Sequence, residues 1–296
     1  MPTPLSEKNK VVTGLAVKIL IMHEALTMSQ NSTCEYEERA VCFIDILGFK
    51  ALVQRSESDQ YYRDLIGKLV DTAIDEAKAS KAWSLFPGEI PAEQKFGAEV
   101  VHFSDCLVLS VSSMDFWGLA WLFDTITAIG EKLIWEGVAI RGGATIGKLY
   151  HKEDKIFGPA MVEAYEMESK IAQVPRIIVS ERLRDTINNL SSDEKWSLFD
   201  SKLSWNPDYW IIDYIRKNTT VMLYGPKFVN YIDRLRMLIS QGLQSIDPSV
   251  LGKYEWLRRQ YNALLADIRA VQQKGEITER DILEKVEIVS SWPVIV

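Results

Sequence analysis

Residues 40–49 read Ala-Val-Cys-Phe-Ile-Asp-Ile-Leu-Gly-Phe, a compact apolar run that ends at Asp45 and is followed by Gly48. Such a run, closed by an acid and a glycine, is typical of a buried strand that leads into a helix. The pattern therefore predicts a strand from Arg39 with Asp45 at its carboxyl end. A phosphate cradle is expected from the backbone N–H groups at the start of the following helix, those of Ile46, Leu47, Gly48 and Phe49.

A second acid is predicted to meet Asp45. Two β-like runs, Ala98–Phe103 and Cys106–Val111, are separated only by Ser104 and Asp105, which predicts a hairpin with an acid at its tip. If this hairpin pairs with the first strand, both carboxylates lie at one edge of a sheet. Two hard anions at one point favour Mg²⁺ or Mn²⁺ together with nucleotide phosphates. The alternative is that Asp105 is only a turn residue and Asp45 only a helix cap.

The elements around these acids predict an α+β fold. Helical spacing covers roughly residues 59–79 and 114–135, and Gly158-Pro159 opens another helix through Ala172. Strands are expected at 138–146, which carries Arg141, and at 177–179, with an exposed connection over 148–156. The order β-α-β-β-α-β-α-β suffices for one antiparallel or mixed sheet backed by helices.

Composition narrows the functional classes. Among 296 residues, Lys and Arg number 34 against 41 Asp and Glu, and this net charge of −7 disfavours general nucleic-acid binding. Three cysteines without a C-x-x-C pair argue against a disulfide framework or structural zinc and favour the cytoplasm. Residues 14–28 are apolar but contain Lys18, His23 and Glu24, so neither a membrane span nor a signal peptide is expected.

Four segments together resemble the class III nucleotidyl cyclases. Residues 43–49 are similar to the F-x-D-I-x-G-F signature, in which the Asp and the following carbonyl, here Asp45 and Ile46, bind metal. Asp105 stands where these enzymes place their second metal-binding Asp. Residues 140–147 resemble the R-x-G-I-x-x-G strand, and residues 157–164 resemble the start of the catalytic helix. The match covers about residues 39–180.

The resemblance implies a ferredoxin-like α+β core that binds a nucleoside triphosphate and two Mg²⁺ or Mn²⁺ ions per active site. It further implies a homodimer with composite sites, in which one protomer supplies the metal-binding groups and the other the groups that face the base. An apolar stripe on the C-terminal helix, formed by Trp256, Tyr261 and Leu265, also favours dimerisation. We expect a helical arm and linker at 1–38, a catalytic domain at 39–224 and a helical extension at 225–296.

The sequence departs from the purine cyclases at two places. The positions of the transition-state Asn and Arg hold Val162 and Glu166, neither of which can donate to a phosphoryl oxygen. Other cations would have to substitute, and Arg141 is the expected catalytic one. The remaining cations on neighbouring elements are Lys148, Lys155, Lys170 and Arg176, of which Arg176 and Lys155 are expected to contact the nucleotide.

The positions that select the base point toward a pyrimidine. They align with Val101 and Lys155, although a shift of one residue replaces Lys155 by Asp154. In this respect the chain resembles the bacterial Pycsar pyrimidine cyclases, which implies cyclic UMP or cyclic CMP as the product, an antiviral role and a separately encoded effector that senses the product. Of the two products we expect cyclic UMP, because Lys155 as a cation can donate to O4 of uracil. A CTP cyclase, a purine cyclase with an unusual pocket and an inactive nucleotide-binding pseudo-cyclase remain the alternatives.

Overall fold

The computed structural model describes residues 34–82, 91–205, 208–216, 227–275 and 280–296. One compact unit runs from Glu37 to Val296, and residues 1–36 form a unit of their own. The helix expected within residues 1–38 lies outside the described residues. None of the described helices combines the length and the apolarity that crossing a bilayer requires.

A mixed sheet of eight strands forms the centre of the compact unit, and the fold is α+β, as predicted. Seven strands follow the order β2-β3-β1-β4-β6-β8-β7, and β5 pairs with the far part of β4. All pairs are antiparallel except β4 with β6. The strands are β1 (Glu37–Ile46), β2 (Glu99–Phe103), β3 (Cys106–Val111), β4 (Ile140–Lys152), β5 (Lys155–Phe157), β6 (Ile177–Val179), β7 (Leu203–Trp205) and β8 (Trp210–Ile212).

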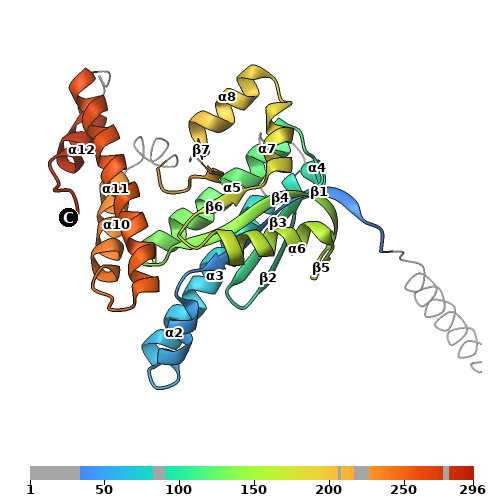
Figure 1. The fold of residues 1–296 in the computed structure, drawn as a ribbon, viewed down its shortest axis with the longest axis horizontal. Coiled ribbons are helices and arrows are strands. Elements are labelled where there is room, and N and C mark those ends of the chain that lie inside the picture. Colours follow the sequence, from blue (N-terminus) through green and yellow to red (C-terminus); the bar gives the residue numbers. More distant parts are fainter. Residues whose placement is uncertain (1–33, 83–90, 206–207, 217–226, 276–279) are drawn as a thin grey trace, which may run out of the picture. The chain divides into compact units, whose positions relative to one another are not determined.

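Helices cover both faces of this sheet, as Figure 1 shows. They are α2 (Phe49–Ser56), α3 (Gln60–Ala82), α4 (Ala92–Phe96), α5 (Phe116–Trp135), α6 (Pro159–Glu166), α7 (Glu181–Asn188), α8 (Ser192–Ser201), α10 (Phe228–Gly242), α11 (Pro248–Lys274) and α12 (Arg280–Ser290). A π-helical segment, η1 (Met167–Ile171), continues α6 without a break.

The alternation of β1 explains the two layers. Cys42 and Ile44 point into the large core that includes α3 and α5, while Val41 and Phe43 point into a smaller cluster beneath α6. Because both faces are covered, six consecutive positions of β1 are buried, which is why its sequence is a continuous apolar run. Asp45 follows Val41 and Phe43 on the α6 face of the sheet.

The close approach of α6 to the sheet depends on Gly143 of β4. A Cβ atom on Gly143 would lie 2.6 Å from the carbonyl oxygen of Ala164. The neighbouring Gly142 faces the other way, and a Cβ there would lie 2.2 Å from the carbonyl oxygen of Phe43 on β1. No larger residue fits at either position without moving backbone. Gly143 therefore permits the contact that places η1 beside the end of β1.

The exposed connection predicted over residues 148–156 is wrong. Strand β4 continues to Lys152 and turns back into β5, with Leu149 and His151 buried. Polar residues alternate with these two along the strand, and this period-2 pattern is what half-buried strands show. The sheet also gains β7 and β8 beyond Ser180, where the sequence pattern was too mixed for a prediction.

The apolar stripe of the C-terminal helix is covered within the chain. Trp256, Tyr261 and Leu265 lie on α11 and are 8%, 0% and 0% exposed. Helix α11 packs against α10 and α12, and α10 packs in turn on α5. The stripe is therefore core rather than a free surface, and it lends no support to the expected dimer.

Candidate functional site

The two predicted acids meet at one edge of the sheet. Asp45 is the penultimate residue of β1 and stands in register between Cys106 of β3 and Arg141 of β4. Asp105 lies in the two-residue turn between β2 and β3, where Ser104 adopts a left-handed φ of 56°. The backbone N–H of Ile46 donates to the carbonyl oxygen of Asp105 over 3.1 Å, which fixes the turn beside the end of β1. The predicted hairpin and the predicted meeting of the two acids are confirmed.

Arg141 lies between Asp45 and a third acid, Glu168. Its Nε donates to Oδ2 of Asp45 at 2.8 Å, and its Nη2 lies 2.7 Å from Oε1 of Glu168, without the alignment of a hydrogen bond. Both partners are largely shielded, since their side chains are 15% and 4% exposed. In the structure Arg141 therefore forms a salt bridge with both acids.

Glu168 was not predicted from the sequence. It is on η1, and it is 3% exposed. Its spacing along the sequence could have identified it. Glu168 lies four residues after Ala164 and eight after Ala160, and these two alanines form the helix stripe that packs on the sheet. An acid at a buried stripe position points to a specific charged partner.

The electrostatics of the cluster favour added positive charge. Burial raises the pKa of Asp45, Arg141 lowers it, and the neighbouring Asp105 raises it again. Burial and the charges of Asp45 and Asp105 raise the pKa of Glu168 to about 7, against the opposing effect of Arg141 and Lys253. Three carboxyl groups thus share one guanidinium, and a divalent cation would relieve their mutual repulsion.

The donor atoms fit a hard divalent cation. Ligand atoms of Asp45, Asp105 and Cys106 all lie within 4.8 Å of one another. Burial and the surrounding carboxylates raise the pKa of the Cys106 thiol to about 12, so it stays protonated at neutral pH and is a poor metal ligand. The carboxylate oxygens remain, which are the ligands that Mg²⁺ and Mn²⁺ prefer.

The phosphate cradle is smaller than predicted. The N–H of Ile46 is bound to Asp105, and the N–H of Leu47 donates to the carbonyl oxygen of Ala139 at 2.9 Å, so neither can reach a phosphate. Gly48 adopts the left-handed φ of 83° that turns the chain into α2, which begins at Phe49. The first N–H groups of a helix have no partner within it, so the first turn of α2 is the part that can bind an anion.

The residues expected to face the base and the phosphates come from β2, β5 and α6. Val101 of β2 packs, half-buried, against the cluster beneath α6, and Lys155 begins β5 and is exposed. On α6, Val162 is 58% exposed, while Glu166 pairs with Lys170 at 2.7 Å. Lys155 pairs with Lys152, at the end of β4 opposite to Arg141.

Arg176 does not face the acid cluster with its side chain. Its Nη2 donates to the carbonyl oxygen of Ile171, and its guanidinium lies over the ring of Tyr209. Burial lowers its pKa. The contribution of Arg176 to the site is through its backbone, since its carbonyl oxygen accepts the N–H of Gly142 at 3.0 Å and holds β4 in place.

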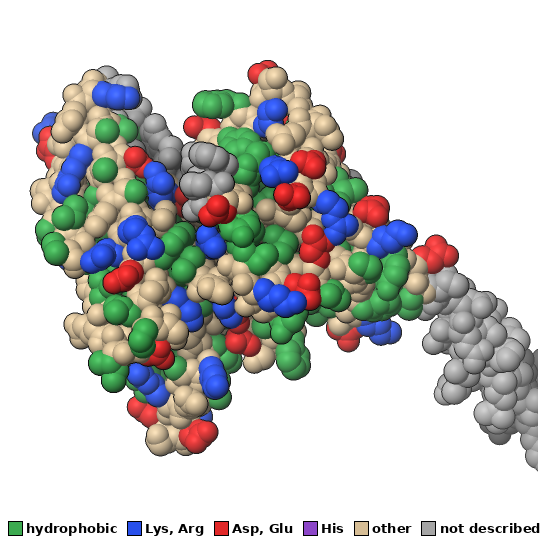
Figure 2. All heavy atoms as spheres, viewed as in Figure 1, with side chains coloured by type: hydrophobic (Ala, Val, Ile, Leu, Met, Phe, Trp, Pro, Cys, Tyr) green, Lys and Arg blue, Asp and Glu red, His purple; other side chains and the backbone are tan. Residues whose placement is uncertain are grey.

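Three exposed hydrophobic side chains on the α6 side of the sheet form what we call the α6 patch. They belong to β2 and α6, and are Phe103, Val162 and Tyr165, between 52% and 82% exposed. Figure 2 shows apolar side chains gathered on this face of the molecule. Exposed apolar clusters of this kind mark interaction surfaces.

Comparison with known proteins yields only distant structural similarity. No family model and no curated protein matches the chain. Among solved structures, a bacterial light-regulated adenylyl cyclase is 14% identical with a TM-score of 0.37, and the match covers 62% of this chain and 58% of that one. A class III adenylyl cyclase-like ATP-binding protein from Pseudomonas aeruginosa is 14% identical with a TM-score of 0.39, and the match covers 63% of this chain and 40% of that one. This chain thus spans less than two thirds of either structure.

Proposed function

We propose that this protein is a metal-dependent nucleotidyl cyclase that converts UTP to 3′,5′-cyclic UMP and pyrophosphate. The observation that carries the proposal is the convergence of Asp45 and Asp105 beside the first turn of α2. The two acids come from positions 60 residues apart in the sequence, and their charge exceeds what Arg141 can balance. A carboxylate pair next to a helix N-terminus is suited to hold a metal–triphosphate complex.

The reaction needs no covalent bond to the protein. The ribose 3′-oxygen forms a bond to the α-phosphorus, the bond from that phosphorus to the bridging oxygen breaks, and pyrophosphate leaves while the hydroxyl proton passes to solvent. Asp45 and Asp105 would hold two Mg²⁺ or Mn²⁺ ions, with the carbonyl of Ile46 as a further ligand. When bound, these ions supply Lewis acidity that lowers the pKa of the hydroxyl and offsets phosphate charge.

Arg141 is the cation of this chain that can act near the α-phosphate. In the structure it neutralises Asp45 and Glu168. If metal takes over the charge of Asp45, Arg141 becomes available to a phosphoryl oxygen while Glu168 still orients it. This role replaces the Arg and Asn that Glu166 and Val162 do not provide.

The site is proposed to be completed by a second copy of the chain. Lys155 follows β4 at the end opposite to Arg141, the neighbour of Asp45, and we assign the two residues to different halves of a composite site. The α6 patch, beside Lys155 and Val101, offers the apolar surface that a homodimer interface needs. We place the base against Val101 and Lys155 of one protomer and the metal ions on the acids of the other.

The choice of UTP rests on Lys155. As a cation it can donate to O4 of uracil, whereas it would face the exocyclic amine of adenine or cytosine unfavourably. If Asp154 in the β4–β5 turn faces the base instead, CTP becomes the preferred substrate. Lys155→Asp should shift the substrate preference away from UTP only if Lys155, rather than Asp154, faces the base.

The decisive experiment incubates the full chain with each of the four ribonucleoside triphosphates and Mn²⁺ and separates the products by chromatography. We expect cyclic UMP as the main product, no product from Asp105→Ala, and undiminished activity in Asp71→Ala, an exposed acid on α3. Preferential turnover of CTP, ATP or GTP would replace the substrate assignment. Absence of any cyclic product would favour a nucleotide-binding pseudo-cyclase instead. Its inactivity would then be explained by the engagement of Arg141 with Asp45 and by Val162 and Glu166 at the transition-state positions.

From the resemblance to the Pycsar cyclases we further propose a role as a second-messenger generator in bacterial defence against phage. The partner would be a separate effector that binds the product. The test is survival of phage-challenged cells that express the chain with its neighbouring genes, compared with cells that express Asp105→Ala.

A further inference from the structure

A large apolar pocket lies on the opposite face of the sheet from the α6 patch. Its volume is about 620 Å³, and helices α3, α5 and α8 with the end of α4 form its walls. None of its lining residues belongs to the acid cluster or to the α6 patch. Volumes of this order are typical of sites for small organic ligands.

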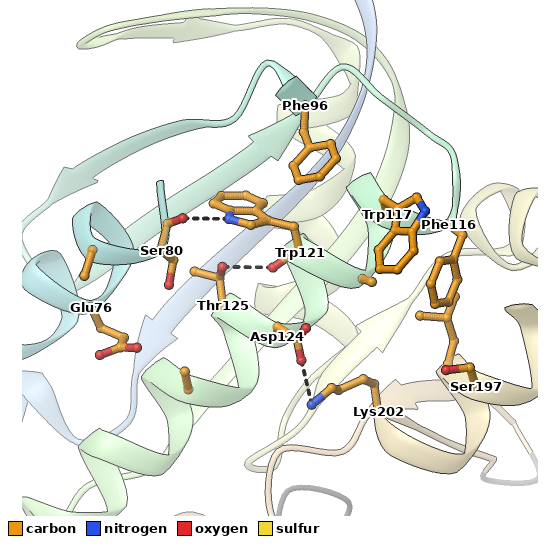
Figure 3. A pocket seen from close by; sticks show the side chains of 14 residues that line it. Glu76, Ser80, Phe96, Phe116, Trp117, Trp121, Asp124, Thr125, Ser197 and Lys202 are labelled. Carbon is orange, nitrogen blue, oxygen red and sulfur yellow. Dashed lines mark hydrogen bonds and ion pairs between the residues drawn. The ribbon is translucent and has the colours of Figure 1, made fainter. Parts of the chain in front are cut away.

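Aromatic rings dominate one side of this pocket. Figure 3 shows Trp117 and Phe116 at one end and Trp121 with Phe96 above, while Glu76 and Ser80 of α3 stand opposite. Trp117 is 49% exposed, although it is one of the largest apolar side chains of the molecule. Trp121 and Phe96 are 5% and 3% exposed, so the large open ring surface of the pocket is that of Trp117. A planar, apolar occupant would stack on this ring and remove it from contact with water.

The polar groups of the walls are already satisfied. Trp121 Nε1 donates to the carbonyl oxygen of Ser80 at 2.9 Å, and the Thr125 hydroxyl donates to that of Trp121 at 2.9 Å. The charged groups are paired as well. Lys202 lies 2.7 Å from Asp124, and Glu76 lies 2.7 Å from Lys132, which is outside the lining.

This charge pattern excludes a nucleotide and selects a neutral ligand. Glu76 and Asp124 are the acids of the lining and Lys202 is its base, so a phosphate or sulfonate would meet two carboxylates and one ammonium that is already engaged. A neutral ring system leaves both ion pairs intact and buries the aromatic wall.

We infer that this pocket is a binding site for a neutral, planar aromatic small molecule, separate from the nucleotide site. The inference goes beyond the proposed cyclase activity and does not depend on it. The ligand would stack between Trp117, Phe116 and Trp121 and leave the Asp124–Lys202 pair at its polar edge.

Two dyes with the same ring skeleton test this assignment. N-phenyl-1-naphthylamine is neutral, and 8-anilinonaphthalene-1-sulfonate adds one negative charge; both fluoresce strongly in apolar surroundings. With the full chain we expect saturable, one-to-one binding of the neutral dye, at least about tenfold tighter than that of the sulfonate. Equal or tighter binding of the sulfonate would overturn the ligand class.

Variants on α5 locate the dye. Trp117→Ala removes one wall and should weaken binding about tenfold, and Ala120→Phe fills the space and should abolish it. Trp196→Ala is the matched control, because Trp196 is 71% exposed on α8 and does not line the pocket. Wild-type affinity in Ala120→Phe, or loss of binding in Val162→Ser of the α6 patch, would overturn the site.

The same titration separates this site from the proposed active site. Mn²⁺ and UTP should not displace the neutral dye, and Asp105→Ala should bind it with wild-type affinity. Displacement by UTP, or lost binding in Asp105→Ala, would show that the dye reports on the nucleotide site and would refute a separate ligand site. Since the readout is fluorescence without turnover, a protein that fails to cyclise UTP still tests the pocket.

Discussion

Asp45 and Asp105 lie at the same edge of the sheet, but their negative charges are balanced differently. Asp45 has Arg141 as a hydrogen-bonded partner, while Asp105 makes no ion pair within the part of the chain that the structure describes. Removing the first acid takes away the hydrogen-bonded partner of Arg141, which then keeps only the Glu168 contact, while removing the charge of the second relieves repulsion. The two residues that we propose as equivalent metal ligands are therefore expected to differ in their effect on stability.

We predict that Asp105→Asn is more stable than the wild type in metal-free buffer, by roughly 0.5–1 kcal/mol, because a like charge beside Asp45 is lost. Asp45→Asn should be less stable than the wild type. Thermal melts with EDTA and with excess Mn²⁺ check this, because Mn²⁺ should raise the melting temperature of the wild type alone. An Asp105→Asn protein that melts below the wild type in EDTA would contradict the proposed repulsion.

A second residue-level feature is the buried network around His151. The Nε of Arg39 donates to the Ser110 hydroxyl at 3.0 Å, and that hydroxyl lies 2.8 Å from Nδ1 of His151. The Ser110 hydroxyl accepts from Arg39 and still has its own proton to donate to Nδ1 of a neutral imidazole. Nε2 is buried and has no hydrogen-bond partner among the described residues. Burial and the charges of Arg39 and Lys81 lower the pKa of His151 to about 3.

This network predicts acid sensitivity. Between the unfolded pKa near 6.5 and the folded value of about 3, the unfolded chain binds a proton that the folded chain refuses, so stability falls as the pH falls. From about pH 7 to about pH 5 the loss from this one group is about 2 kcal/mol. His151→Gln should lose correspondingly less over the same range. Urea unfolding at both pH values measures it, and parallel losses in the two proteins would refute the assignment to His151.

At the scale of elements, the contact between β4 and the α6–η1 segment positions the charged cluster. Gly143 permits this contact, and η1 then places Glu168 beside Arg141. A π-helical turn widens the helix by one residue, and such turns occur often at functional sites.

We predict that Gly143→Ala destabilises the fold by about 1–3 kcal/mol, since the new Cβ would lie 2.6 Å from both the Ala164 carbonyl oxygen and Met167 Cβ. Gly67→Ala is the matched control. Nothing lies within 4 Å of a Cβ at this helical position of α3, so it should stabilise by up to about 1 kcal/mol. Urea denaturation of both variants checks the pair, and a Gly143→Ala protein as stable as Gly67→Ala would show that α6 is not tightly packed.

At the scale of the whole molecule, the C-terminal helices are part of the body that carries the site. Helix α10 packs on α5, where the rings of Trp135 and Tyr231 lie 6.3 Å apart. Lys253 of α11 acts electrostatically on Glu168 and lowers its pKa against the effect of burial. The helical extension expected from residue 225 therefore stabilises the core and influences the acid cluster.

The composite site predicts complementation between protomers. Asp105→Ala and Lys155→Ala should each be inactive alone, while an equimolar mixture should regain about a quarter of wild-type activity, because half of the dimers carry one intact site. A mixture of Asp45→Ala and Asp105→Ala should stay inactive, since both changes fall on the same half-site. Activity assays on mixed proteins measure this, and full activity of a strictly monomeric protein would contradict the dimer.

The sequence alone determined the central strands, the hairpin with Asp105 at its tip and the α+β class. These follow from local pattern: an apolar run, a two-residue turn and helical periodicity are properties of neighbouring residues. Tertiary structure decided the rest. It placed Glu168 beside Arg141. It engaged the N–H groups of Ile46 and Leu47 in hydrogen bonds within the protein. It also covered the apolar stripe of α11 with α10 and α12. Each of these depends on which distant segment lies opposite a residue, and that is set by packing between elements rather than by spacing along the chain.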